Sequence, residues 1–433
     1  MRAKLVKQLK KVVLTLTAVV FMSNVAFAGE VDKLATILAE KGIISYGEAQ
    51  RIITETKEDI RHQTATGKNE NLPLWIQRMQ IKGDIRVRSQ IDSADVDAVN
   101  TNGDYRIRER IRLRFGIETY ALDSLKVAFG IATGALAGTG DKNPTSTNHT
   151  FEAFNKAPIF LDYAYIQYAA PIIEGLVVSG GKVKNGLQLW APSQLIWKND
   201  VNPDGLAINY TTDVGNGINV FANAGWYALG ELRERTNTAV KNGMPTLLIA
   251  QPGASYSKGD FSAKVGLSLQ QFYVKGNTIA SNEPGTWWSS GAEIMDYSLV
   301  NPGWEIKMKN VVNDYGVSFS GDFVKNVTES ATQAINDQNK EGYILCIGIG
   351  DDKIGSFGTW QAKGAYRRLD AYAIPTGWGN TDAYSAKPGK GWEYSLALGL
   401  LANLSFNLNY YEMTNLDGQA PTRLTQFDFI YKF

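Results

Sequence analysis

The chain has 433 residues, of which 44 are Lys or Arg and 43 are Asp or Glu, so its formal net charge is only +1. This near balance argues against nucleic acid as a partner, because that function requires a clear excess of basic residues. The single cysteine, Cys346, excludes an intramolecular disulfide framework. With only two histidines, His62 and His149, the sequence predicts no enzyme, no metal site and no cofactor.

The first 28 residues predict a cleaved signal peptide. Five basic residues lie between Arg2 and Lys11, an apolar stretch follows from Val12 to Met22, and Ala26-Phe27-Ala28 is a typical cleavage site. The apolar stretch has about eleven residues, well short of the ~20 that a membrane-spanning helix needs. We therefore expect secretion across the inner membrane of a bacterium.

Residues 29–72 predict a short periplasmic helical segment. Apolar residues recur at helical spacing from Val31 to Leu38, and Gly42 suits the end of a first helix. Ser45-Tyr46-Gly47-Glu48 has the pattern of a capping box that opens a second helix. The segment could be a partner-binding coiled coil, a plug or spacer, or a helical hairpin packed under the next domain.

From residue 79 onward, apolar and polar residues alternate with a period of two, which is typical of β-strands with two different faces. We predict sixteen strands, although fourteen or eighteen also fit the pattern, and the stretch 290–309 is long enough to contain an interruption. The predicted strands are 79–90, 104–119, 123–136, 159–170, 174–184, 203–211, 216–228, 246–257, 260–274, 290–309, 314–327, 341–350, 356–371, 391–401, 403–412 and 422–433.

The connectors between these strands alternate between short and long. Short ones, such as 257–259, are followed by long ones, such as 275–289. A transmembrane barrel has short turns on the periplasmic side and long loops outside, whereas a soluble sandwich has no reason for this alternation. Residues 73–433 are therefore predicted to form a closed, antiparallel, up-and-down β-barrel of about sixteen strands. This is an all-β transmembrane fold in contact with outer-membrane lipid.

The predicted strand 104–119 carries five arginines on one face. A lipid-facing arginine near the middle of the bilayer costs roughly 2–4 kcal/mol, so this face is predicted to line a water-filled lumen. The alternative is the solvated face of a soluble sheet, and Glu109 on the apolar face is left without an explanation. We call these five residues the arginine ladder: Arg106, Arg108, Arg110, Arg112 and Arg114. Other predicted basic residues of the lumen are Arg86, Arg88, Lys363 and Arg367.

The predicted third long loop mixes tryptophans with acidic and turn residues, which suits a loop packed against a wall. The run from Gly181 to Gly205 resembles the "Putative porin" family of outer-membrane channels, and so does the helical stretch from Leu38 to Gln50. This resemblance implies that the loop folds inward and narrows the pore. The implied constriction residues are Trp190, Trp197, Asp200 and Asp204.

The last predicted strand has aromatic residues on one face and polar residues on the other. It resembles the closing strand of bacterial outer-membrane proteins, whose last residue is typically Phe, and we expect Phe433 to act as an assembly signal. The alternative is an ordinary amphipathic edge strand. The aromatic face consists of Phe427, Phe429, Tyr431 and Phe433, following Thr425.

These features predict an outer-membrane porin that lets small hydrophilic solutes or ions diffuse passively, with a preference for anions. By analogy with sixteen-stranded porins, we expect a homotrimer. Two other functions fit the sequence. One is a structural or partner-binding barrel, for example a sheath for a periplasmic electron carrier. The other is a sugar-specific channel with an aromatic track formed by Trp190, Trp197 and Trp226.

Overall fold

The computed structural model describes two separate units of the chain, Met1–Gln77 and Arg78–Phe433. In the first unit, residues 48–55 are helical and α4 spans Leu74–Gln77. None of the described helices has the length and apolar character that a membrane crossing needs. The predicted signal peptide, 1–28, lies outside the described residues, as does most of the predicted helical segment. The described residues are 37–38, 41, 48–55, 72–94, 105–134, 146–229, 244–273, 297–328, 339–375, 379–380, 382, 389–416 and 421–433.

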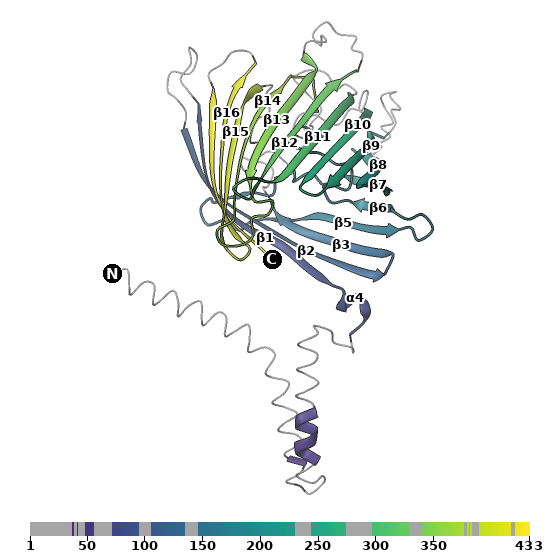
Figure 1. Cartoon of the computed structure of the whole chain (residues 1–433). Helices are drawn as coiled ribbons and strands as arrows, with labels where there is room; N and C mark the ends of the chain where they lie inside the picture. The colour runs from purple at the N-terminus through teal and green to yellow at the C-terminus, as the bar shows by residue number, and fades with distance from the viewer. Residues whose placement is uncertain are drawn as a thin grey trace, which may run out of the picture. The chain divides into compact units, whose positions relative to one another are not determined.

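The second unit is a closed antiparallel β-barrel (Figure 1). Apart from β4, which pairs with β2 so that β3 pairs with β5, each strand pairs with its neighbours in the sequence, and β1 pairs with both β2 and β17, which closes the wall. The strands are β1 (Gln80–Ala94), β2 (Tyr105–Leu122), β3 (Leu125–Thr133), β4 (His149–Thr150), β5 (Ile159–Ala169), β6 (Leu176–Lys182), β7 (Asp204–Gly215), β8 (Ile218–Ala228), β9 (Thr246–Lys258), β10 (Phe261–Tyr273), β11 (Tyr297–Val312), β12 (Tyr315–Asn326), β13 (Glu341–Gly350), β14 (Trp360–Leu369), β15 (Gly389–Leu401), β16 (Leu404–Asn415) and β17 (Thr422–Lys432).

The predicted barrel of sixteen strands is confirmed, with one additional short strand. The addition is β4, whose two residues pair with the part of β2 that extends beyond β3. Two residues are too few to show a period of two, so the sequence pattern could not reveal β4.

Turn chemistry explains the short ends of the hairpins. Asn216 and Gly217 between β7 and β8 both have positive φ, and so do Asn313 and Asp314 between β11 and β12. Two-residue turns with positive φ at both positions match the twist of paired strands, and Asn, Asp and Gly adopt that conformation most readily. By strand order, longer connectors alternate with short turns as the sequence predicted, except that the connector 351–359 at the short-turn end is longer than the connector 416–421 at the other end.

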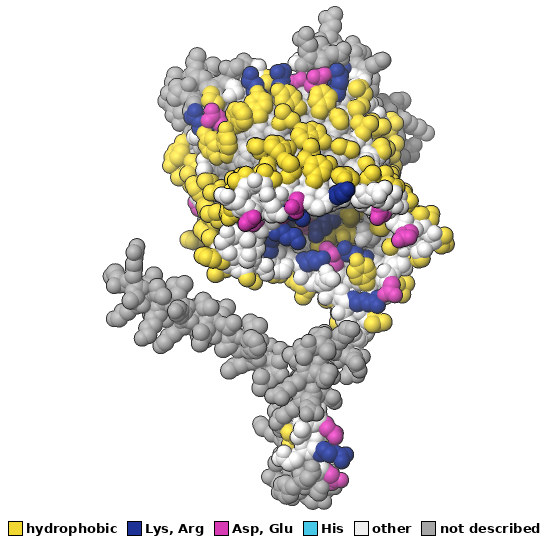
Figure 2. All heavy atoms as spheres, in the orientation of Figure 1, with side chains coloured by type: hydrophobic (Ala, Val, Ile, Leu, Met, Phe, Trp, Pro, Cys, Tyr) yellow, Lys and Arg dark blue, Asp and Glu magenta, His cyan; other side chains and the backbone are white. Residues whose placement is uncertain are grey.

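The outer face of the barrel is apolar. Hydrophobic side chains form a broad band over the wall in Figure 2, while charged side chains gather along its upper edge and inside the hollow below the band. Ile107 and Ile347, for example, each expose 52% of their surface on this face. Such a band suits contact with hydrocarbon rather than with water.

Part of the interior is filled by a loop between β6 and β7, residues 183–203, which we call the inward loop. Its Leu195 and Trp197 are buried in one cluster with Tyr227 of β8, Phe272 of β10 and Leu299 of β11. A loop that buries apolar side chains against the inner wall is held in place by the same burial that stabilises a protein core.

Candidate functional site

The arginines of β1 and β2 lie side by side on the inner face of the barrel. In the strand register, Arg86 is opposite Arg112 and Arg88 is opposite Arg110. These four side chains are buried, and Arg88 and Arg110 each expose only 4% of their surface. The remaining ladder residues, Arg106, Arg108 and Arg114, belong to the same face of β2 because they lie at even spacings from Arg110.

Most of these arginines have acidic partners. Arg88 donates two hydrogen bonds to Asp428 of β17, at 2.7 and 2.8 Å. Asp84 of β1 accepts from both Arg112 and Arg114, at 2.7 and 2.6 Å. The basic wall is therefore a paired network rather than a row of isolated positive charges.

The paired network continues toward the long-loop end. Arg108 pairs with Asp92 at 2.7 Å. By contrast, Arg86 has an uncharged partner among the described residues, since its guanidinium donates to the side-chain oxygen of Asn148. Arg110 donates to Thr150 and Gln90, both uncharged. The segment before β4 thus serves to cover the ladder, a role that the sequence did not indicate.

Glu109, the acidic residue on the outer face of β2, has a hydrogen-bond partner on the neighbouring strand. Ser89 lies opposite Glu109 in the register, and its hydroxyl donates to the Glu109 carboxylate at 2.7 Å. A hydrogen bond to an ionised group lowers the cost of placing that group on an apolar face.

The basic residues of β14 lie apart from β2 along the wall. Arg367 is almost fully buried and pairs with Glu393 of β15. Lys363 lies four residues before Arg367, on the same face of β14, and is exposed. The structure therefore places Arg367 in a buried ion pair, and it places Lys363 in a wetter part of the interior.

The inward loop is attached to the wall by side-chain hydrogen bonds to several strands. Gln251 of β9 accepts from the backbone N–H of Trp190 at 2.8 Å and donates to its carbonyl at 2.7 Å. Ser193 donates to Asp322 of β12 at 2.6 Å. Because these contacts reach strands distant from β6 and β7, the loop crosses the lumen instead of projecting outward.

The two acidic residues assigned to this loop behave differently. Asp200 lies 3.9 Å from Arg114 of the ladder, which brings the loop against the basic wall. Asp204 is instead the first residue of β7, and it pairs with Lys182 of β6 at 3.1 Å. Asp204 therefore belongs to the barrel wall and not to the inward loop, and its carboxylate pairs with a lysine of the neighbouring strand.

A second segment reaches inward from the connector between β14 and β15. The backbone N–H of Asn380 donates to the carbonyl of Gln194 in the inward loop at 3.1 Å. Asp382 lies 3.5 Å from Arg88. The sequence showed only a long connector here, so it gave no reason to expect an acidic residue on the basic wall.

The environment of Asp382 favours its ionised form. Burial alone would raise the pKa of this carboxyl, but the charge of Arg88 and a hydrogen bond from Gln426 hold the pKa below its ordinary value. Asp382 is therefore negatively charged at neutral pH and lowers the positive potential near Arg88.

The three tryptophans suggested for an aromatic track do not lie together. Trp197 is buried and its indole N–H donates to Gln270 at 3.1 Å. Trp226 of β8 alternates with the inward Tyr227 and exposes 41% of its surface on the outer face. Trp190 and Trp197 both border a cavity inside the barrel, and Trp226 does not.

Comparisons with known proteins place this fold in a family. The family model described as "Putative porin" matches residues 94–307 and 294–433, which is more than half of the chain. A search of curated proteins finds no match.

Several solved structures have a similar chain trace at low sequence identity. OprB of Pseudomonas putida is 9% identical, with a TM-score of 0.49 over 82% of this chain and 94% of that one. A triple mutant of the Rhodopseudomonas blastica porin is 11% identical, with a TM-score of 0.42 over 82% and 100% of the two chains. The trimer form of OmpT, an outer membrane protein of Vibrio cholerae, is 10% identical, with a TM-score of 0.42 over 82% and 99%.

Proposed function

Because the chain belongs to the "Putative porin" family of outer-membrane channels, we propose that it lets small hydrophilic solutes or ions diffuse through its lumen. On this proposal, the path narrows where the inward loop approaches the arginine ladder. The observation that carries this proposal is the approach of Asp200 on the loop to Arg114 on the wall, at 3.9 Å. Charged groups of both signs at the edge of a passage orient and select the solutes that pass beside them.

We further propose a modest preference for anions. One carboxylate, Asp84, serves two arginines, and Arg86 has an uncharged partner among the described residues. Positive charge on this wall is therefore only partly compensated. Salt screens exposed charges beyond about 8–10 Å, whereas charges that line a narrow passage lie closer than this to a passing ion. The uncompensated positive charge on this wall therefore affects ion selectivity more than the net charge of the chain does.

Planar-bilayer recording in a KCl gradient tests the proposal. We expect the wild-type reversal potential to lean toward chloride and Arg86→Gln to move it toward zero. Lys309→Gln, at an exposed position near a short turn, is the control and should leave it unchanged. A cation-selective wild type that Arg86→Gln does not alter would contradict the anion preference, and the absence of any open current would contradict the channel.

Several expectations about assembly also stay predictions. These are removal of residues 1–28, a periplasmic helical segment at 29–72, and a homotrimer. N-terminal sequencing of the membrane-inserted protein and native mass measurement in detergent check the first and last of these. For Phe433 we propose an assembly role, supported by its ring contact with Tyr431 at 6.3 Å and with Phe115 at 6.5 Å.

The two alternative functions have less support. A sheath around a protein-sized electron carrier requires an open lumen, and the inward loop crosses it. A sugar-specific aromatic track requires several accessible rings along the path, and Trp226 lies on the outer face while Trp197 is buried.

A further inference from the structure

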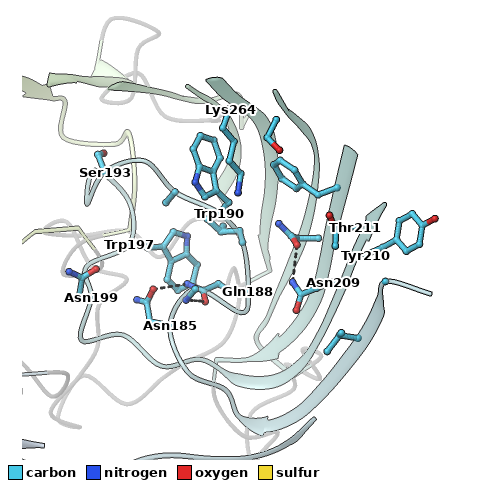
Figure 3. Close-up of a pocket in the computed structure, with 18 residues that line it drawn as sticks. Asn185, Gln188, Trp190, Ser193, Trp197, Asn199, Asn209, Tyr210, Thr211 and Lys264 are labelled. Carbon is cyan, nitrogen blue, oxygen red and sulfur yellow. Dashed lines mark hydrogen bonds between the residues drawn. The ribbon is translucent and has the colours of Figure 1, made fainter. Parts of the chain in front are cut away.

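A cavity of about 570 Å³ lies between the inward loop and the wall formed by β7 to β10 (Figure 3). A volume of this size accommodates a small organic molecule. On one side it is bordered by loop residues around Trp190, and on the other by Asn209, Phe221 and Lys264. Most of the amide side chains here are already used to hold the loop. For example, Asn209 donates to the carbonyl of Leu187 and to Asn223, both at 2.8 Å.

Lys264 is the one charged side chain among the described residues that line this cavity. Its ammonium group lies 4.8 Å from the ring centroid of Trp190 and 4.7 Å from that of Phe221. Its cross-strand neighbour Glu305 is engaged by Lys307 at 3.1 Å. No described residue forms a hydrogen bond or an ion pair with Lys264, so its donors are available to a solute.

The two aromatic rings hold Lys264 in a fixed place. Cation–π contacts stabilise an ammonium group over an aromatic face. Both rings rest on glycines of the wall: a Cβ at Gly253 would lie 2.1 Å from the Phe221 ring, and one at Gly266 would lie 3.2 Å from the Trp190 ring. The absence of side chains at these two positions therefore makes room for the pair of rings and for the lysine between them.

We infer that Lys264, Trp190 and Phe221 form a binding subsite for small organic carboxylates that have an apolar body. Such solutes would bind at this subsite on their way through the lumen, so the inference rests on the proposed function. The ammonium group binds the carboxylate, and the ring edges beside it contact the apolar body. A sugar would need a free aromatic face, and Lys264 already covers the Trp190 ring. The chemistry of the cavity thus favours an organic anion over a neutral sugar.

Equilibrium dialysis of the full-length, detergent-solubilised protein with labelled benzoate tests this inference directly. We expect saturable binding that Lys264→Gln weakens about tenfold, because a hydrogen bond to a charged partner is lost, and tenfold equals about 1.4 kcal/mol. Lys264→Arg should retain most of the binding. Lys258→Gln, at the exposed end of β9 outside the cavity lining, is the matched control. Gel mobility of unheated samples verifies that each variant is folded.

Two uncharged probes complete the test. Benzyl alcohol, which has the same ring without the carboxylate, should bind weakly, and so should glucose. Equal binding of benzyl alcohol, preferential binding of glucose, or benzoate binding that Lys264→Gln does not change would each overturn the inference.

Conductance separates this inference from the proposed function. In bilayers, benzoate should reduce the chloride current of the wild type more than that of Lys264→Gln. If the barrel shows no current but still binds benzoate through Lys264, the channel proposal fails and the subsite stands. If the barrel conducts ions but binds no benzoate, the subsite fails and the channel proposal stands.

Discussion

Gly83 and Phe433 exchange two backbone hydrogen bonds across the seam that closes the barrel. The N–H of Gly83 donates to the Phe433 carbonyl at 2.9 Å, and the N–H of Phe433 donates to the Gly83 carbonyl at 3.1 Å. A Cβ at Gly83 would lie 2.6 Å from the Phe433 ring and 2.3 Å from the backbone oxygen of Arg114. The aromatic ring can cover the seam only because residue 83 has no side chain.

Gly83→Ala should therefore weaken the seam. Forcing a methyl group into a filled space typically costs about 1–3 kcal/mol, so we expect a lower urea midpoint for unfolding from lipid vesicles. Gly364→Ala is the control, because a Cβ there meets its nearest neighbour at 3.7 Å, an ordinary contact. Equal midpoints for the two variants would show that the Phe433 ring and the backbone at Arg114 both adjust without cost.

The Arg88–Asp428 pair predicts a different effect on stability. Both side chains are almost fully buried, at 5% and 2% exposure. Asp428→Ala leaves the buried guanidinium with less compensation, and breaking such a pair typically costs about 3–5 kcal/mol. Glu412→Ala, which breaks an exposed pair with Arg423 at 3.3 Å, should cost at most about 1 kcal/mol. Urea unfolding of both variants checks this, and similar losses would mean that Asp382 compensates Arg88 on its own.

Gln251 predicts how the inward loop controls the size of the passage. Gln251→Ala removes both hydrogen bonds to the Trp190 backbone, so the loop should move more freely and the single-channel conductance should rise. Gln167→Ala, which removes a hydrogen bond to Ser179 within the wall, is the matched control. If both variants conduct like the wild type, the apolar packing of the loop is enough to hold it.

Asp382 predicts how selectivity depends on pH. Its pKa lies below the ordinary value of 3.8, so its charge and its contact with Arg88 persist above that pH and are lost only as pH falls through the lowered pKa. Reversal potentials should therefore stay constant from about pH 8 to about pH 5. Asp382→Asn should increase the preference for chloride over this whole range. A titration of the wild-type potential near neutral pH would place the controlling group elsewhere.

The strands were predictable because their pattern is local. The alternation of Ile and Arg in β2 is visible in ten consecutive residues, and turns such as Asn216-Gly217 are marked by their own composition. Most predicted strand ends lie within about four residues of the observed ones, but the predicted strand 290–309 corresponds to β11 at Tyr297–Val312, and residues 290–296 lie outside the described residues. For example, the turn after β2 lies at Asp123-Ser124, whereas the predicted strands 104–119 and 123–136 placed it at 120–122.

The partners of the arginines were not predictable in the same way. Asp428 is 340 residues from Arg88, and their contact requires the barrel to close in one particular register. Asp382 and Asn148 lie in connectors without periodicity, so nothing in their neighbours indicates that they face the ladder. In the sequence, Lys264 cannot be distinguished from any other inward-facing lysine of a strand. Its contact with Trp190 becomes visible only once the inward loop is in place.

The position of β1 between β2 and β17 has a kinetic consequence. Joining residues 340 positions apart is a contact of very high sequence separation, which makes closure a late and slow step of folding. Before closure, the free edge of β17 can pair with β1 in several registers. A shift of one residue would place Arg88 opposite Phe427 or Phe429 and turn every side chain of the incoming strand to the wrong face. The Arg88–Asp428 pair stabilises only one register of β1 against β17. A charge pair inside the closed wall thus also selects the correct register when these two strands join.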